Sequence, residues 1–273
     1  MNNMTLRAIS GTIYIAVLCF GILVHVNVAF GLFLALALIA FSEFTKNGKE
    51  SLELKSNLFS YLSIVLLFIG INGSFIGLSE TTTKLFLFSS IFGIAGTFLY
   101  ELFKNFEKGA ANIVFQLGGL VYAALPFCFA LPFAHLNGNY QGMVLISLFI
   151  LIWSSDTFAY LCGRTFGKHK LFEKISPKKT WEGFIGGAIL TVGSGIVLYY
   201  TTDITSLSNW ILFALLAVIF GSIGDLIESM FKRSIGIKDS GNIIPGHGGI
   251  LDRMDSFIVA LPVIYAFFSI FGL

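Results

Sequence analysis

The sequence predicts an all-α, polytopic integral membrane protein with about nine transmembrane helices and a cytoplasmic N-terminus. Two features of its composition carry this prediction: 56% of the 273 residues are apolar and 12% are charged, against ~45–50% and ~25% in an ordinary globular chain. A water-soluble domain cannot bury so much apolar surface, so a soluble enzyme, a disordered chain and a secreted disulfide scaffold are excluded. A third feature, the length of the apolar runs, gives the number of helices.

The first long apolar run, residues 8–42, contains no Asp, Glu, Lys or Arg. As a single helix it would be about 52 Å long, which is too long for a hydrocarbon core of ~30 Å. We therefore expect two helices with a turn near residues 25–27; a single helix, and so eight spans in all, is the alternative. The remaining spans are expected at residues 57–77, 84–105, 111–133, 141–162, 182–201, 208–230 and 252–272.

The basic residues decide the expected orientation, because short loops rich in Lys and Arg stay in the cytoplasm. With nine spans and the N-terminus inside, 16 of the 17 Lys and Arg residues fall on the cytoplasmic side and Lys84 alone falls on the other. The two longest loops, 163–181 and 231–251, are both basic and both cytoplasmic in this arrangement. We expect the chemistry to lie in these loops and at the helix ends beside them.

Acidic residues near the cytoplasmic ends of spans are the first functional candidates, because a charge inside a membrane costs ~2.5–3.5 kcal/mol on insertion scales. They are Asp156, Asp225, Glu228, Asp252 and Asp255. The last four form two pairs, each spaced three residues apart and therefore on one helical face. Two such faces at one depth would offer the oxygen ligands that Mg²⁺ prefers. The alternative is that these carboxylates form salt bridges with Lys232, Arg233 and Arg253 at the membrane boundary.

The loop before the last span combines glycines with positive charge. Gly246, Gly248 and Gly249 permit close backbone approach, and backbone N–H groups ahead of a helix bind anions, so we expect a phosphate there. Carboxylates for a metal and bases for phosphates are what phosphoryl or nucleotidyl transfer requires. His247 could contact a phosphate, act as an acid or base, ligate a metal or be structural. A positive-inside loop with a glycine turn is the alternative for the whole segment.

The other basic loop carries Lys178 and Lys179 after a Ser-Pro turn signal, and residues 180–182 are expected to open the next helix. Either lysine could bind a phosphate or an anionic lipid headgroup.

Residues 229–255 resemble the signature of phosphatidate cytidylyltransferases, the CDP-diacylglycerol synthases. The matching positions are Ser229, Phe231, Lys232, Arg233, Lys238, Asp239, Gly241, Ile244, Pro245, His247, Gly248, Gly249, Ile250, Asp252, Arg253, Met254 and Asp255. Residues 156–183 are also similar to the family, and the resemblance covers residues 154–258 in all.

The resemblance implies a dimeric membrane enzyme that makes CDP-diacylglycerol and pyrophosphate from CTP and phosphatidate with Mg²⁺; whether a second, monovalent cation takes part stays open. It implies that Asp225 and Asp252 bind the metal, with Asp255 in the same cluster. The catalytic group is then Asp225, Asp252, Asp255, Lys232 and His247. The substrate-binding group is Ser229, Arg233, Lys238, Asp239, Gly248, Gly249, Arg253, Asp156, Lys178 and Lys179.

The same resemblance implies a place in a bacterial-type inner membrane with the active site facing the cytoplasm. Residues 1–140 would then serve packing and dimerisation, and residues 141–273 would hold the catalytic region. No nucleic-acid partner is expected. The rival readings are another lipid-phosphate enzyme, such as a polyprenol kinase or a phospho-sugar transferase, and a transporter. A transporter would need midplane charges and inverted repeats, whereas here the polar residues gather near one surface and no repeat is visible.

Overall fold

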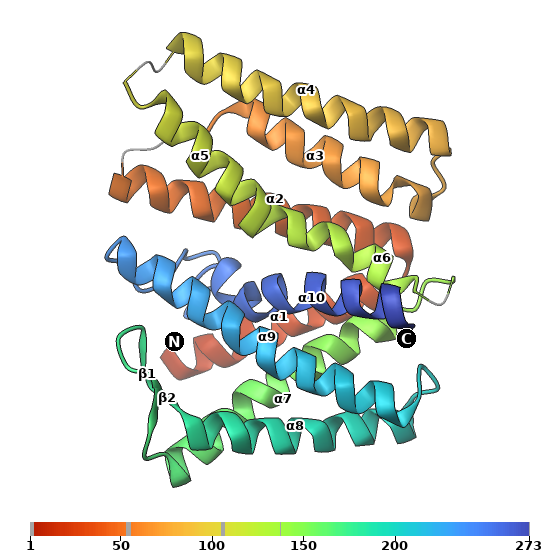
Figure 1. Ribbon diagram of the computed structural model, residues 1–273, viewed down its shortest axis with the longest axis vertical. Helices are drawn as coiled ribbons and strands as arrows, with labels where there is room; N and C mark the ends of the chain where they lie inside the picture. The colour runs from red at the N-terminus through yellow and green to blue at the C-terminus, as the bar shows by residue number, and fades with distance from the viewer. Residues whose placement is uncertain (1–2, 53–55, 105–106, 137, 273) are drawn as a thin grey trace. The chain divides into compact units, whose positions relative to one another are not determined.

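The computed structural model describes residues 3–52, 56–104, 107–136 and 138–272 (Figure 1). Within these ranges, nine helices are long and apolar enough to cross a membrane, which confirms the predicted number and removes the alternative of eight. The side chain of Lys49 and the whole of Lys55, two basic residues assigned to the cytoplasmic side, lie outside the described residues. The chain forms two compact units, Met1–Pro132 with Ile235–Arg253, and Phe133–Ser234 with Met254–Leu273.

The first unit contains the N-terminal spans. They are α1 (Asn3–Leu23), α2 (Val26–Leu52), α3 (Leu58–Asn72) with the 3-10 turn Gly73–Ile76, α4 (Glu80–Lys104), and a fifth span built from α5 (Gly109–Gly119), a π-helical turn (Leu120–Ala124), a 3-10 turn (Leu125–Phe129) and α6 (Ala130–Ala134). The break between α1 and α2 confirms the predicted turn, where the amide N–H of Asn27 donates to His25 Nδ1 over 3.1 Å. Pro126 lies at the irregular part of the fifth span, where a missing N–H prevents regular α-helix.

The second unit contains α7 (Gly142–Phe166), strands β1 (Lys170–Phe172) and β2 (Ser176–Thr180), α8 (Trp181–Thr201), α9 (Leu207–Ser234) and most of α10 (Leu251–Phe271). The helices α7 and α9 run further than predicted, so both basic loops are shorter than expected. The antiparallel pairing of β1 with β2 was not predicted; among the described residues the fold is otherwise helical, apart from an isolated β-bridge between Ile244 and Gly248. Thr180 caps α8 by accepting from Gly183 N over 3.2 Å, as the sequence predicts.

Aromatic side chains fill the core of the second unit. Phe149 of α7 stacks on Phe257 of α10 at a centroid distance of 4.7 Å, and Phe213 of α9 meets Phe268 of α10 edge-on at 5.6 Å. Gly224 lets α9 approach α10 closely, because a Cβ there would clash with the carbonyl oxygen of Asp255. The acidic residues of α7, α9 and α10 are thereby held on packed helices.

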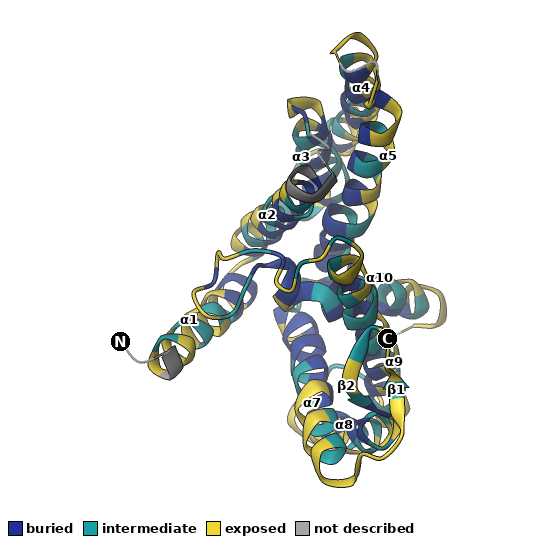
Figure 2. Cartoon of the chain, turned by 90° about the vertical axis from the view of Figure 1, so that its left-hand side faces the viewer, coloured by how far each residue is buried: buried dark blue, intermediate teal, exposed yellow. Residues whose placement is uncertain are grey.

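In the first unit, exposed apolar residues lie along α1 and α4, as expected for helices that contact lipid (Figure 2).

The units differ from the predicted division at residue 140, because the segment Ile235–Arg253 groups with the N-terminal helices. Hydrogen bonds explain this grouping: Ser10 of α1 bonds to Pro245 and His247, and Asn47 Nδ2 of α2 donates to the Ser240 carbonyl over 2.9 Å. The roles assigned to the two halves of the chain stay predictions.

Candidate active site

Three of the predicted acidic residues gather in the second unit. Asp156 comes from α7, Asp225 from α9 and Asp255 from α10, and the Asp255 carboxylate interacts electrostatically with the other two and with Lys232. The close approach of α9 and α10 at Gly224 accounts for the nearness of Asp225 and Asp255. Of the two predicted acidic pairs, one member of each, Asp225 and Asp255, takes part in this interaction.

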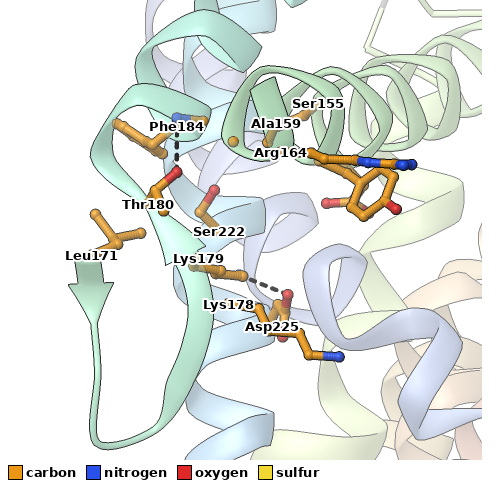
Figure 3. Close-up of a pocket in the computed structure, with 14 residues that line it drawn as sticks. Ser155, Ala159, Arg164, Leu171, Lys178, Lys179, Thr180, Phe184, Ser222 and Asp225 are labelled. Carbon is orange, nitrogen blue, oxygen red and sulfur yellow. Dashed lines mark hydrogen bonds and ion pairs between the residues drawn. The ribbon is translucent and has the colours of Figure 1, made fainter. Parts of the chain in front are cut away.

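Asp225 has two partners in this cluster. Lys179 Nζ lies 2.6 Å from Asp225 Oδ2 (Figure 3). In addition, Ser229 Oγ donates to Asp225 Oδ1 over 3.2 Å. The alternative of a boundary salt bridge is thus realised for Asp225, but with a lysine of the hairpin rather than with the basic residues that follow it on α9. For Glu228 the expected alternative is confirmed, because Lys232 forms an ion pair with it one helical turn later.

A cavity of about 300 Å³ lies beside this ion pair (Figure 3). Its charged lining combines acidic and basic side chains: Asp156 and Arg164 from α7, Lys178 and Lys179 from β2, and Asp225 from α9. Helices and a strand from separate parts of the unit therefore bring both signs of charge to one hollow. Such a cavity can hold a phosphate-bearing molecule against the bases while its carboxylates remain available to a cation.

The hairpin that supplies the two lysines is anchored at its base by Glu182, at the start of α8. This carboxylate accepts from the backbone N–H groups of Lys168 and His169 and lies 2.6 Å from His169 Nδ1. In addition, Trp181 N donates to the His169 carbonyl over 3.0 Å. The sequence predicted that residues 180–182 open a helix, but it did not predict the contact between Glu182 and His169, since their spacing carries no motif.

Asp252 belongs to the first unit and has three hydrogen-bond donors on one oxygen. Its Oδ2 accepts from Ser240 N over 2.8 Å, from Ser240 Oγ over 2.9 Å and from Gly249 N over 2.8 Å. The next two backbone N–H groups, of Ile250 and Leu251, donate to Glu43 of α2 over 3.0 and 2.9 Å.

These bonds correct the expectation that the glycine loop presents open N–H groups to a phosphate. Gly249 N is engaged by Asp252, and Gly248 N donates to the Ile244 carbonyl over 3.2 Å. The positive end of α10 is neutralised by protein carboxylates, which compete with any other anion for the same donors. A substrate-binding role for Gly248 and Gly249 stays a prediction, and it would have to use other atoms.

His247 is oriented by α1. The Ser10 hydroxyl lies within hydrogen-bond distance of the Pro245 carbonyl oxygen at 2.8 Å and of the Arg7 carbonyl oxygen at 3.1 Å. Ser10 Oγ also lies 3.0 Å from His247 Nδ1, and which of these two atoms donates depends on the imidazole tautomer. Arg253 Nε donates to the His247 carbonyl over 3.0 Å.

The predicted site residues fall into two groups, one in each unit. The second unit holds Asp156, Lys178, Lys179, Asp225, Ser229, Lys232, Arg233 and Asp255, and the first holds Lys238, Asp239, His247, Gly248, Gly249, Asp252 and Arg253. The side chains of Arg233, Lys238 and Asp239 are exposed. Over the part of the chain that the structure describes, no three His, Cys, Asp or Glu side chains converge as a metal site. The metal role of Asp225, Asp252 and Asp255 stays a prediction.

Two buried glutamates were not among the residues that the sequence predicted as functional. Glu43 of α2 is 5% exposed and Glu101 of α4 is 0% exposed, and both lie within spans. A signal for them was available, because any carboxylate in an apolar helix is a candidate for function or for a specific structural contact. Glu43 is the first charged residue after the charge-free run at residues 8–42.

Comparison with known proteins shows which protein family the chain is similar to. The model of the cytidylyltransferase family matches residues 5–271. The phosphatidate cytidylyltransferase of Staphylococcus haemolyticus is 51% identical over 122 residues, which are 44% of this chain and 46% of that protein. The phosphatidate cytidylyltransferase of Staphylococcus aureus is 40% identical over 167 residues, 60% of this chain and 62% of that protein. The chain thus spans about half to three-fifths of the curated relatives it matches.

Proposed function

Because the chain belongs to the cytidylyltransferase family, we propose that it transfers the cytidylyl group of CTP to phosphatidate, forming CDP-diacylglycerol and pyrophosphate. The observation that carries this proposal is the cavity of the second unit, about 300 Å³ in volume, which is lined by Lys178, Lys179 and Arg164 together with Asp156 and Asp225. The named relatives support phosphatidate as the acceptor, since both are phosphatidate cytidylyltransferases.

The proposed reaction needs no nucleophile from the protein. A phosphate oxygen of phosphatidate attacks the α-phosphorus of CTP, a new P–O bond forms, and the bond to the β-phosphate breaks with its electrons leaving on pyrophosphate. Both reactants are anions, so the protein must lower their repulsion and hold them in line. Lys178, Lys179 and Arg164 are the groups that can do this in the cavity. Lys179, already paired with Asp225, would turn its ammonium toward a phosphate oxygen.

The residues fit a bound Mg²⁺ by the chemistry of their donors. Mg²⁺ is held in many nucleotide enzymes by one or two carboxylates together with substrate phosphates and water, so a cage of three protein ligands is not required. Asp225 and Asp255, both in the second unit, would hold the ion, and a metal role for Asp252 follows from the family resemblance. When bound, the ion would neutralise charge on the phosphates.

Orientation and assembly belong to the same proposal. We place the cavity on the cytoplasmic side of a bacterial inner membrane, because its hairpin and the adjoining end of α7 carry a concentration of Lys and Arg. That side would let soluble CTP meet a lipid headgroup. A homodimer follows from the family resemblance and has no further support.

Two labels on CTP separate this function from its rivals. The purified protein, in detergent with phosphatidate and Mg²⁺, should move an α-³²P label from CTP into lipid and release a γ-³²P label as pyrophosphate in equal amount. A CTP-dependent lipid kinase would instead place the γ label in lipid and release CDP. Lipid that carries the γ label, or no lipid label at all, would refute the proposal.

A further inference from the structure

Glu43 is a buried carboxylate that the proposed chemistry does not use. It lies in the α2 span and is 5% exposed. Its Oε1 accepts from Ile250 N over 3.0 Å, and its Oε2 accepts from Leu251 N over 2.9 Å. A carboxylate at this depth is costly to bury, and hydrogen bonds from two backbone amides offset that cost.

The start of α10 explains why these two amides need a partner from elsewhere. The first N–H groups of a helix have no acceptor within it, and a polar residue before the helix normally supplies one. Here the preceding residue is Ile250, whose side chain has no oxygen. Glu43, which is 207 residues away in sequence, takes the role of the cap. Its negative charge also complements the positive end of the helix dipole.

Two glycines of the loop create the space for this carboxylate. A Cβ at Gly249 would lie 2.5 Å from Glu43 Oε2 and from Ser240 Oγ, and a Cβ at Gly241 would clash with Glu43 Oε1. Both positions therefore require glycine, because the carboxylate of Glu43 occupies the space that a Cβ would need. One turn further along α2, Asn47 Nδ2 donates to the Ser240 carbonyl over 2.9 Å, so α2 holds both ends of the loop.

Ser240 connects Glu43 to Asp252. Its hydroxyl lies 2.9 Å from Asp252 Oδ2 and 3.4 Å from Glu43 Oε2, and its backbone N–H donates to Asp252. The two carboxylates also interact electrostatically. Because Glu43 and Asp252 bind consecutive amides from Gly249 to Leu251, a displacement of Glu43 would displace the donors that orient Asp252.

We propose that Glu43 is a positioning residue: it fixes residues 240–251 in the conformation that orients Asp252 and His247. Its function in catalysis rests on the proposed cytidylyl transfer. Glu43 touches no reactant in this scheme and acts through the loop.

The test compares Glu43→Gln with a matched control, Glu101→Gln. A Gln side chain has one accepting oxygen, so one of the two amides at residues 250–251 would lose its acceptor and face an NH₂ group. Glu101 is also a buried glutamate, and it accepts from the side chains of Asn57, Asn112 and Gln116, which lie outside residues 240–251.

Hydrogen–deuterium exchange measured without metal or nucleotide reports the loop directly. Glu43→Gln should speed exchange in the peptide that covers residues 240–251 by about tenfold, as expected for the loss of a charged hydrogen bond, and Glu101→Gln should leave that peptide unchanged. In assays with CTP and phosphatidate, Glu43→Gln should lower kcat by at least about tenfold with KM for CTP within about threefold. Glu43→Asp keeps the charge and both oxygens and should recover part of both effects.

Unchanged loop exchange in Glu43→Gln would overturn the proposal, and so would faster exchange with unchanged kcat. Equal effects of Glu101→Gln on the loop would also overturn it, because they would mean general loosening of the fold. If Glu43→Gln fails to fold, Ser240→Ala takes its place, since it removes only the hydroxyl between the two carboxylates and should give a smaller change of the same kind. A wild-type protein that transfers no cytidylyl group would refute the proposed function, whereas the exchange comparison would still decide whether Glu43 holds the loop.

Discussion

Replacing Asp225 by Asn removes one negative charge from the cavity and keeps the shape of the side chain. In the structure, Asp225 pairs with Lys179 at 2.6 Å, and the two side chains are 31% and 26% exposed. The hydrogen bond from Ser229 Oγ can remain, because an Asn oxygen accepts as well as a carboxylate oxygen does. The substitution therefore isolates the charge of Asp225 from its packing.

The expected losses of stability and of activity differ in size. A partly exposed ion pair contributes at most about 1 kcal/mol, so the free energy of unfolding should fall by about that amount or less. A loss of that size in transition-state stabilisation would slow the reaction only about fivefold. Removing a group that stabilises charge in the transition state slows a reaction by ~10²–10³-fold. We expect Asp225→Asn to show the larger loss of kcat.

The assay is incorporation of α-labelled CTP into lipid, paired with thermal unfolding of the same preparations. The matched control is Asp203→Asn in the exposed connection between α8 and α9, outside the residues that line the cavity. It should keep activity within about twofold. If Asp225→Asn keeps more than a fifth of the wild-type kcat while Asp203→Asn behaves as stated, the carboxylate is only a structural partner of Lys179 and the reasoning fails.

Three further predictions concern charges and the metal. Lys179→Met should raise KM for CTP about tenfold, because it removes a charged donor worth ~1.5–3 kcal/mol, while Lys170→Met on β1, outside the cavity, should not; equal KM values for the two would contradict this. Asp252→Asn should leave the unfolding temperature nearly unchanged, because an Asn oxygen can accept the hydrogen bonds that Ser240 and Gly249 donate to Asp252 Oδ2, but should lower label incorporation at least about 100-fold; retained incorporation would remove Asp252 from the site. EDTA should abolish incorporation and added Mg²⁺ should restore it, and turnover that persists in excess EDTA would remove the metal from the mechanism.

Local patterns in the sequence were enough to predict the spans and part of the site. The thickness of the hydrocarbon core limits helix length, so the run at residues 8–42 had to break, and it does so between α1 and α2. The i,i+3 spacing of the acidic residues predicted that Asp225 and Glu228 meet Asp252 and Asp255; the structure shows an electrostatic interaction of Asp255 with Asp225 and Asp156, and the predicted metal site stays a prediction.

The parts that were missed depend on contacts between distant segments. The cap of α10 comes from Glu43, 207 residues before Ile250, and no local pattern links them. Gly249 was interpreted as part of a phosphate-binding turn, because the buried carboxylate beside it is visible only in three dimensions. The hairpin at residues 170–180 is short and mostly polar, and its pairing depends on the anchor between His169 and Glu182 rather than on alternating hydrophobicity.

The most direct measurement is an experimental structure of the protein with CTP, Mg²⁺ and an unreactive phosphatidate analogue. The account predicts the triphosphate in the cavity of the second unit, with phosphate oxygens in contact with Lys178 or Lys179 and the ion on Asp225. Nucleotide bound away from this cavity, with Lys179 still paired to Asp225, would contradict it.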